Sequence, residues 1–265
     1  MALPLKAILI QAPLVWADKI ANLNYFTNQL NKIEKDTDLI ILPEMFATGF
    51  VTEVIEIAED TGGPVFQWLS EQSKKQNAVI TGSIAVKEGN NYYNRLIWMR
   101  PDGSYEIYDK RHLFRMGNEH LNFSQGSKPL IIELKGWKIR PLVCYDLRFP
   151  VWSKNRLIND GYEYDVLIYV ANWPASRCYA WQTLLAARAI ENQAYCIGVN
   201  RIGIDGKGIP YKGGSVILDF KGKRQSGCDD DKAQLLTGIL DYDSLIHYRE
   251  QFKVALDWDT FNINY

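Results

Sequence analysis

Short apolar runs along the chain alternate with segments in which apolar residues recur every three or four positions. The runs predict buried strands, and the second pattern predicts amphipathic helices. One helix is expected after Asp18, which is suited to cap it, another from Pro64 to about Gln76, and a third over about 179–192. The predicted strands span residues 6–11, 38–42, 78–86, 92–99, 105–108, 131–134, 138–143, 166–170, 195–200, 216–220 and 235–240.

The order of these elements favours an α/β fold with two mixed sheets and helices outside each face. Strands and helices do not alternate strictly, as they would in a barrel, and turns at Gly89-Asn90-Asn91 and Pro101-Asp102-Gly103 indicate hairpins. The chain shows no low-complexity linker and no short repeat. A single domain over residues 1–265 is therefore expected.

Composition narrows the class of protein. The 265 residues are 47% hydrophobic and 23% charged, with a formal net charge of −1, which is ordinary for a soluble globular protein. This balance gives no pull toward nucleic acid or an anionic membrane, and no apolar run approaches the roughly 20 residues of a membrane span. The N-terminus reads as the start of the first strand and not as a signal peptide. Four cysteines in a chain of this length suggest a reducing cytoplasm.

The most informative position is Cys144, which directly follows the strand predicted to end at Val143. The chain is expected to turn there from the strand into a helix. A helix is expected after this corner, to about Asp160. A thiol at a strand-to-helix corner is exposed on one side and lies near the positive end of the helix, which favours thiolate. We therefore interpret Cys144 as a nucleophile.

Two further polar residues follow predicted strands, namely Glu44 and Lys110. In layered α/β folds the carboxyl ends of neighbouring strands gather in one crevice, so both side chains are expected near Cys144. Glu44 would act as general base, Cys144 would attack a carbonyl, and Lys110 with the backbone N–H of Tyr145 would stabilise the oxyanion. Spacing alone supports this set only weakly.

Other clusters are less suggestive. The three histidines are scattered and no C-x-x-C pair occurs, so no zinc site is predicted. The run Asp229-Asp230-Asp231 lacks the spacing of a calcium loop. Cys178 and Cys196 are expected to be buried, and Cys228 is expected in a surface loop.

Three local motifs resemble the nitrilase superfamily of carbon-nitrogen hydrolases across nearly the whole chain. They are Leu42-Pro43-Glu44, the segment 108–113 around Lys110, and the segment 143–150 that begins Val-Cys-Tyr-Asp. The Cys-Tyr-Asp corner is similar to amidase branches, whereas true nitrilases carry Cys-Trp-Glu there. The segments 111–116 and 171–174 further resemble the bacterial omega-amidases.

This resemblance implies hydrolysis of the terminal amide of α-ketoglutaramate or α-ketosuccinamate to the keto diacid and ammonia. It also implies a four-layer α-β-β-α sandwich, a homodimer, and neither a cofactor nor a metal. A second active-site glutamate is usual in the family, and Glu119 is the best positional match. It would orient Lys110.

A substrate with a carboxylate calls for a cationic anchor, and arginine suits bidentate binding. Arg177 is the first candidate and Arg115 the second. Arg148 follows Cys144 by four residues, and we favour pairing with a carboxylate that fixes the corner over contact with substrate. Trp173 and Phe50 are expected to wall the pocket, although aromatic residues at such places are also frequent in cores.

Two alternatives remain open at this point. The same machinery would serve an N-carbamoyl amino acid or a simple aliphatic amide, because only the anchor differs. A catalytically silent binding protein on the same fold is the third reading, and the intact Glu44, Lys110 and Cys144 argue against it.

Overall fold

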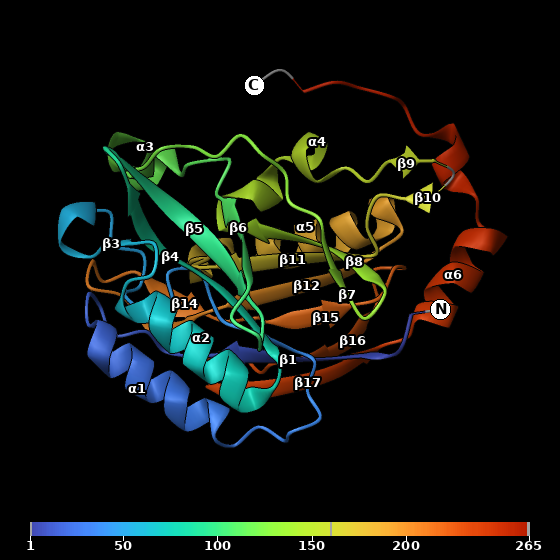
Figure 1. Cartoon of the computed structure of the whole chain (residues 1–265). Helices are drawn as coiled ribbons and strands as arrows, with labels where there is room; N and C mark the ends of the chain where they lie inside the picture. The colour runs from blue at the N-terminus through green and yellow to red at the C-terminus, as the bar shows by residue number, and fades with distance from the viewer. Residues whose placement is uncertain (1, 160, 264–265) are drawn as a thin grey trace.

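The computed structural model describes residues 2–159 and 161–263, in which two β-sheets face each other and helices cover their outer sides (Figure 1). Helices α1 and α2 lie together against one sheet, and α5 lies against the other. The α-helices span Lys19–Leu30 (α1), Pro64–Gln76 (α2), Glu119–Asn122 (α3), Pro150–Ser153 (α4), Cys178–Asn192 (α5) and Tyr242–Gln251 (α6). The predicted α-β-β-α sandwich of two mixed sheets is confirmed.

The first sheet has seven strands within the described residues. Its order is β17-β1-β2-β4-β5-β6, and β3 also pairs with β4. The strands are β1 (Leu5–Gln11), β2 (Leu39–Ile41), β3 (Glu59–Asp60), β4 (Val79–Glu88), β5 (Asn91–Met99), β6 (Tyr105–Asp109) and β17 (Gln234–Leu240). β1, β2 and β4 run parallel, while β5 is antiparallel to both β4 and β6. β2 and β6 therefore point the same way.

The second sheet has the order β16-β15-β12-β11-β8-β7 over the same part of the chain. Its strands are β7 (Ile132–Leu134), β8 (Trp137–Val143), β11 (Val166–Ala171), β12 (Tyr195–Asn200), β15 (Val216–Leu218) and β16 (Arg224–Gly227). β8, β11 and β12 are parallel. Two small hairpins lie apart, β9 (Leu157–Ile158) with β10 (Gly161–Tyr162) and β13 (Ile202–Ile204) with β14 (Pro210–Lys212).

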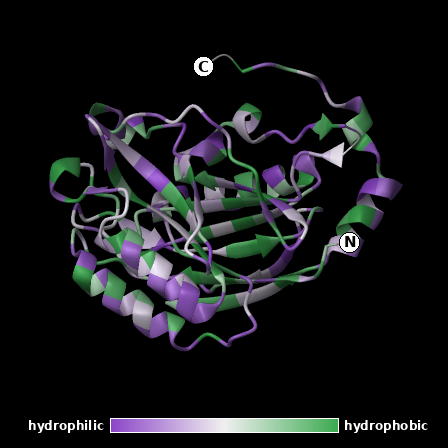
Figure 2. Ribbon diagram, viewed as in Figure 1, coloured by the Kyte–Doolittle hydropathy of each residue, from purple (hydrophilic) through white to green (hydrophobic). Residues whose placement is uncertain are grey.

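The apolar runs fold into strands that are buried on both faces, as Figure 2 shows by the hydrophobic colour of the central strands. Side chains alternate across a strand. In β2, Leu39 and Ile41 point into the core between the sheets, whereas Ile40 packs with Phe26 and Leu69 of the covering helices. A strand buried on both faces reads as a continuous apolar run.

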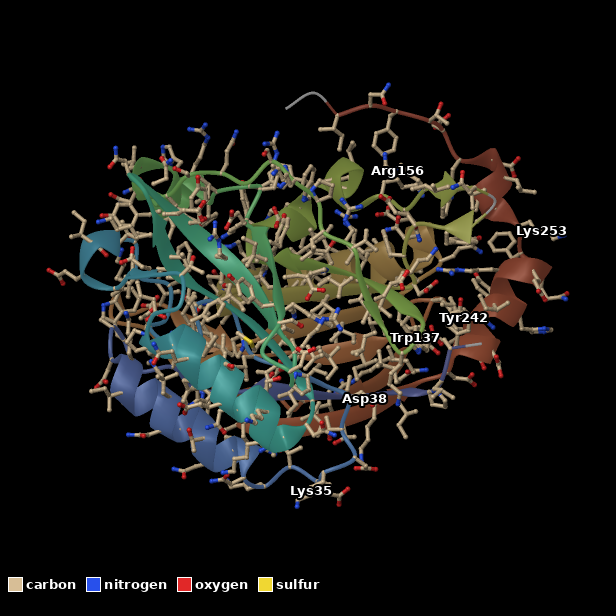
Figure 3. The ribbon with its side chains drawn as sticks, in the orientation of Figure 1. Lys35, Asp38, Trp137, Arg156, Tyr242 and Lys253 are labelled. Carbon is tan, nitrogen blue, oxygen red and sulfur yellow. The ribbon has the colours of Figure 1, made fainter. Side chains whose placement is uncertain are left out.

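Aromatic side chains pack β8 against α6 (Figure 3). The ring of Trp137 on β8 meets Tyr242 of α6 edge to face, with centroids 5.0 Å apart. The ammonium of Lys135 lies 2.8 Å from the carboxylate of Asp38. The apolar pattern did not predict α6, which buries few side chains, among them Leu245.

The prediction of a continuous helix after Cys144 was wrong. A 3-10 helix covers Cys144–Arg148, and the four-residue α4 starts at Pro150. Phe149 between them has φ −117° and ψ 87°, outside the helical region. A residue before proline is driven away from the α conformation, which explains the break. The predicted end of the helix at Asp160 lies outside the described residues.

The remaining cysteines differ from two expectations. Cys196 is buried on β12 as predicted, but Cys178 is exposed at the start of α5. Cys228 is buried, and this burial raises the pKa of its thiol to about 11. Within the described chain, no helix has the length and apolar character that crossing a bilayer requires.

Candidate active site

The ends of three strands meet at a cavity of about 340 Å³. Glu44 follows β2, Lys110 follows β6 and Cys144 follows β8, and all three side chains line this cavity. Because β2 and β6 point the same way in one sheet, Glu44 and Lys110 reach the same edge; β8 delivers Cys144 from the facing sheet. The predicted meeting of the three residues is what the structure shows.

Cys144 sits at a strained corner. Its φ is 42°, a left-handed conformation that a residue with a side chain adopts only when its surroundings hold it there. The residue ends β8 and begins the 3-10 helix, so its half-buried thiol faces the cavity. Tyr145 follows at the start of this helix, where backbone N–H groups have no acceptor within the helix.

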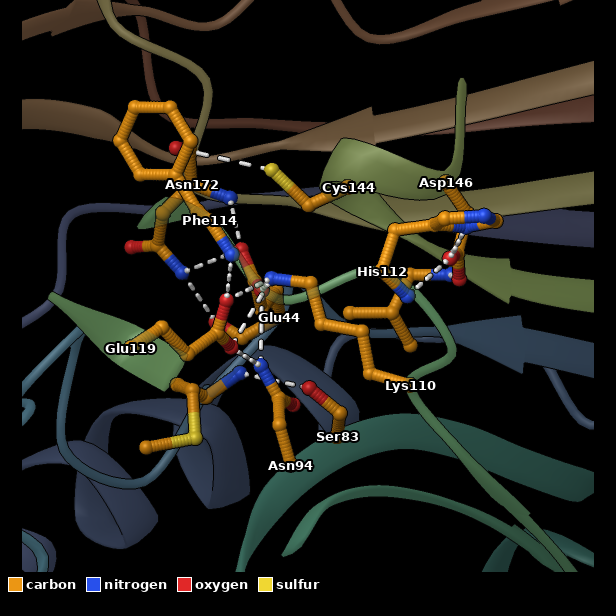
Figure 4. A network of polar contacts seen from close by, with 12 residues as sticks. Glu44, Ser83, Asn94, Lys110, His112, Phe114, Glu119, Cys144, Asp146 and Asn172 are labelled. Carbon is orange, nitrogen blue, oxygen red and sulfur yellow. Dashed lines mark hydrogen bonds and ion pairs between the residues drawn. The ribbon is translucent and has the colours of Figure 1, made fainter. Parts of the chain in front are cut away.

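Lys110 is enclosed by two carboxylates (Figure 4). Its Nζ lies 2.9 Å from Oε1 of Glu44, and 3.0 and 2.9 Å from Oε1 and Oε2 of Glu119. All three side chains are fully buried. Glu119, the first residue of α3, also accepts a hydrogen bond from the backbone N–H of Phe114 at 2.6 Å. Glu119 therefore orients the Lys110 ammonium, as the resemblance implied.

Two asparagines complete this cluster, and sequence reasoning assigned neither of them. Asn94 on β5 donates from Nδ2 to Glu44 at 2.9 Å and to Glu119 at 3.0 Å. Asn172, directly after β11, donates its backbone N–H to Oε2 of Glu44 at 2.8 Å and its Nδ2 to the Glu44 carbonyl at 2.6 Å. Asn172 carried the same signal as Glu44, a polar residue just past an apolar strand. The only sequence signal for Asn94 was that a polar residue stands inside a buried strand.

Charges within the cluster compensate one another. Burial alone would lower the pKa of the Lys110 ammonium, but the charges of Glu119 and Glu44 outweigh it and raise that pKa. Burial raises the pKa of Glu119, against the opposing charge of Lys110. A buried ion needs such partners, since an unpaired one costs far more than it returns. Lys110 therefore stays an ammonium.

The thiol of Cys144 differs from the expectation of a stabilised thiolate. Burial raises its pKa well above 9.0, the charge of Glu44 raises it further, and Lys110 only partly offsets both. The helix that was expected to favour thiolate is a single 3-10 turn. The resting nucleophile is therefore a thiol that needs a base.

The predicted pocket residues divide into two groups. Tyr145, Trp173, Phe50, Arg148 and Arg177 line the cavity together with the reacting side chains. Arg115 is exposed and lines a separate depression with His112 and His120. The 3-10 turn Arg115–Gly117 places its neighbours toward the cavity and turns Arg115 away from it.

The expected pairing of Arg148 with a carboxylate is not what the structure shows. Among the described residues no carboxylate lies within ion-pair distance of Arg148 or Arg177. Instead the guanidinium of Arg148 lies 4.8 Å from the ring centre of Trp173, and that of Arg177 lies 5.3 Å from that of Phe114. Stacking on an aromatic face orients a guanidinium while its N–H groups remain available.

The part of the chain that the structure describes contains no group of three or more histidine, cysteine or acidic side chains placed to hold an ion. A base, a thiol and a buried ammonium around one cavity can perform nucleophilic acyl transfer.

Comparison with known proteins gives consistent matches. The family model described as carbon-nitrogen hydrolase matches residues 6–250. The Omega-amidase YafV of Escherichia coli (strain K12) is 46% identical over 98% of both chains, and the 2-oxoglutaramate amidase of Bacillus subtilis (strain 168) is 34% identical over 73% of this chain and 74% of its own. Among solved structures, XC1258 from Xanthomonas campestris, a CN-hydrolase superfamily protein with an arsenic adduct in its active site, superimposes with a TM-score of 0.97. It is 42% identical, and the match covers 99% of this chain and all of that one.

Proposed function

The chain belongs to the carbon-nitrogen hydrolase family, and we propose that it is a cysteine amidohydrolase of α-keto acid monoamides. Its substrates would be α-ketoglutaramate and α-ketosuccinamate, and its products the keto diacid and ammonia. The omega-amidase and the 2-oxoglutaramate amidase among its relatives support this substrate class. The observation that carries the proposal is one cavity lined by Glu44, Lys110 and Cys144 together with two unpaired arginines.

Acylation would begin at the resting thiol. Glu44 takes the proton of Cys144 as the sulfur attacks the amide carbonyl carbon, and the carbonyl becomes a tetrahedral oxyanion. The Lys110 ammonium and the backbone N–H of Tyr145 stabilise this oxyanion. The intermediate collapses, the C–N bond breaks, and Glu44 returns the proton to the leaving nitrogen. Ammonia departs and a thioester remains on Cys144.

Deacylation would use the same groups in reverse order. Glu44 takes a proton from a water molecule that attacks the thioester carbon, and the oxyanion again faces Lys110 and Tyr145. When the C–S bond breaks, the proton returns to the sulfur. Glu119 keeps Lys110 oriented through both steps, because it accepts from Nζ with both of its oxygens.

The anchor for the substrate carboxylate would be the pair Arg148 and Arg177. Other charged groups of the cavity already have partners: Lys207 lies 3.5 Å from Glu53, and Asp205 accepts a hydrogen bond from Tyr211 at 2.9 Å. Of the basic side chains that line the cavity, Arg148 and Arg177 have no carboxylate partner within the described chain. A substrate anion would complete them, and bidentate geometry suits arginine.

A substrate panel tests the proposal. Ammonia release is measured with α-ketoglutaramate, with an N-carbamoyl amino acid and with a neutral aliphatic amide. We expect the keto acid amide to give the highest kcat/KM. A preference for either other substrate would overturn the substrate class but keep the chemistry. Inactivity on all three would favour a silent binding protein.

Localisation and assembly complete the proposal. The four cysteines are all free, which suits a reducing cytoplasm. A homodimer is expected from the family resemblance. Light scattering coupled to gel filtration distinguishes it from a monomer of 30.4 kDa.

A further inference from the structure

Asp146 lies between the two chain segments that carry Cys144 and Lys110, although it does not line the cavity. It is fully buried two residues after the nucleophile. Its carboxylate has four hydrogen-bond partners, and they come from both segments. Figure 4 shows the contact with His112. None of the acyl-transfer steps uses this side chain.

The partners are sorted between the two oxygens. Oδ2 accepts the backbone N–H of Val143 at 3.0 Å and the hydroxyl of Tyr108 at 2.7 Å. Oδ1 accepts the backbone N–H of His112 at 3.0 Å and lies 2.8 Å from Nδ1 of the same residue. Val143 immediately precedes the nucleophile, while Tyr108 and His112 stand two residues before and after Lys110.

We propose that Asp146 is a positioning residue that fixes the distance and orientation between the Cys144 corner and the Lys110 segment. The inference rests on the proposed function, in which the thiol and the ammonium act on one carbonyl group. The two residues come from different sheets, so no strand pairing sets their separation. Asp146 links the segments directly.

A carboxylate is required here, because each oxygen faces a backbone N–H group. Replacement by asparagine would turn an amide N–H₂ toward either Val143 or His112, and two donors would then face each other. Neither orientation of the amide keeps both backbone bonds. A buried donor left without an acceptor costs free energy, so the segments would shift apart.

The surroundings hold the partners in place. The hydroxyl of Tyr108 also accepts from Nε1 of Trp152 at 2.9 Å, and the ring of Phe149 stacks on His112 with centroids 3.8 Å apart. Burial, and after it the charge of Asp146, raises the pKa of Tyr108, so its hydroxyl stays a donor. The strained φ of Cys144 needs support of this kind.

Asp146→Asn tests the proposal, with Asp165→Asn as the matched control. Asp165 is also buried; it accepts the backbone N–H of Lys138 at 3.0 Å and pairs with Arg249 at 2.6 Å, away from the cavity. We expect Asp146→Asn to lower kcat on the keto acid amide about 100-fold with KM within about twofold, because a misplacement near 1 Å has such an effect. Asp165→Asn should lower the melting temperature and change kcat less than about twofold.

Equal kcat losses in the two variants, or a loss confined to KM, would overturn the proposal. If Asp146→Asn does not fold, Tyr108→Phe decides, since it removes one of the four partners and keeps the ring. A kcat decrease of roughly three- to tenfold at constant KM supports the positioning role, and a wild-type kcat contradicts it.

Alkylation by iodoacetamide separates this inference from the proposed function. Burial, the charge of Glu44 and the charge of Lys110 together set the pKa of Cys144. Displacement of the corner in Asp146→Asn alters all three, so the alkylation rate of Cys144 at pH 8 should change by about threefold or more. The exposed Cys178, followed in the same digest by peptide mass spectrometry, should react at its wild-type rate. Wild-type protein inactive on every amide would refute the function alone. An unchanged Cys144 rate would refute the positioning role.

Discussion

Two groups of charged side chains line the same cavity and differ in how their charges are compensated. The reacting group contains Glu44 and Lys110. The Lys110 ammonium donates hydrogen bonds both to Glu44 and to Glu119. The arginine pair, Arg148 and Arg177, faces aromatic rings and has no carboxylate partner within the described residues. Both groups lie in the same cavity, so their position in the fold does not explain why only one group has its charges paired.

The difference indicates which charged groups take part in the reaction and which bind the substrate. Folding has already placed the buried ions of the reacting group beside partners, so the catalytic geometry exists before substrate arrives. The arginine pair is complete only when an anion enters. Substitutions in the reacting group should therefore slow the reaction on every substrate, whereas substitutions of the arginine pair should change the preference for charged substrates.

Glu44→Gln removes the base from the reacting group. An amide cannot take the proton of Cys144, so kcat should fall about 1,000-fold on every substrate, charged or neutral. Steady-state kinetics with the keto acid amide and a neutral amide measures this, with circular dichroism as the check on folding. A loss confined to the charged substrate would place Glu44 with the anchor instead.

Arg177→Ala and Arg148→Ala each remove one of the two guanidinium groups that would bind the substrate carboxylate. Each should lower kcat/KM for α-ketoglutaramate about 10- to 100-fold, mainly through KM, because a hydrogen bond to a charged group is lost. The neutral amide should be hydrolysed as by the wild type. If both substrates suffer equally, the arginines support the fold and not the substrate.

The pH dependence of Cys144 alkylation tests the compensated group without any substrate. Burial and the charge of Glu44 place the pKa of the thiol above its ordinary value of 9.0 in the folded protein. The thiolate fraction should therefore keep rising about tenfold per pH unit beyond pH 9, where a short cysteine peptide levels off. A plateau near pH 8 would contradict the raised pKa.

The same shift has a consequence for stability. A group whose pKa is raised by folding contributes stability that is fully present below its unfolded value and is lost as the pH rises through its folded value. Cys144 should therefore contribute to a falling melting temperature above pH 9, and Cys144→Ser should reduce that slope.

Arg115→Ala gives the smallest expected effect. Its side chain is exposed in a separate depression, so kcat and KM should stay within about twofold of the wild type. It serves as the matched control for the two cavity arginines, because it removes the same charge nearby. A KM increase as large as that of Arg177→Ala would assign the anchor differently.

The sequence predicted most strands and the meeting of Glu44, Lys110 and Cys144, for a physical reason. Strands buried on both faces leave long apolar runs, and polar residues at their ends mark the edge where parallel strands converge. Glu119 was different, because it begins the four-residue α3 and follows no apolar strand. Only the resemblance to a known family identified it.

The missed features depend on contacts between distant segments. No local pattern tells that Asp146 accepts from Val143, Tyr108 and His112, since two of these lie more than thirty residues away. Asn94 reaches two glutamates only after the sheet has formed. The helix predicted after Cys144 is interrupted at Phe149, because Pro150 drives the residue before it away from the α conformation.

Cys144 is tested as the nucleophile by ammonia release from α-ketoglutaramate, measured side by side for the wild type and for Cys144→Ala. We expect the wild type to release one ammonia for each α-ketoglutarate formed, and the variant, although folded, to stay at the background rate. A wild type at background, or a variant that retains activity, would contradict this expectation.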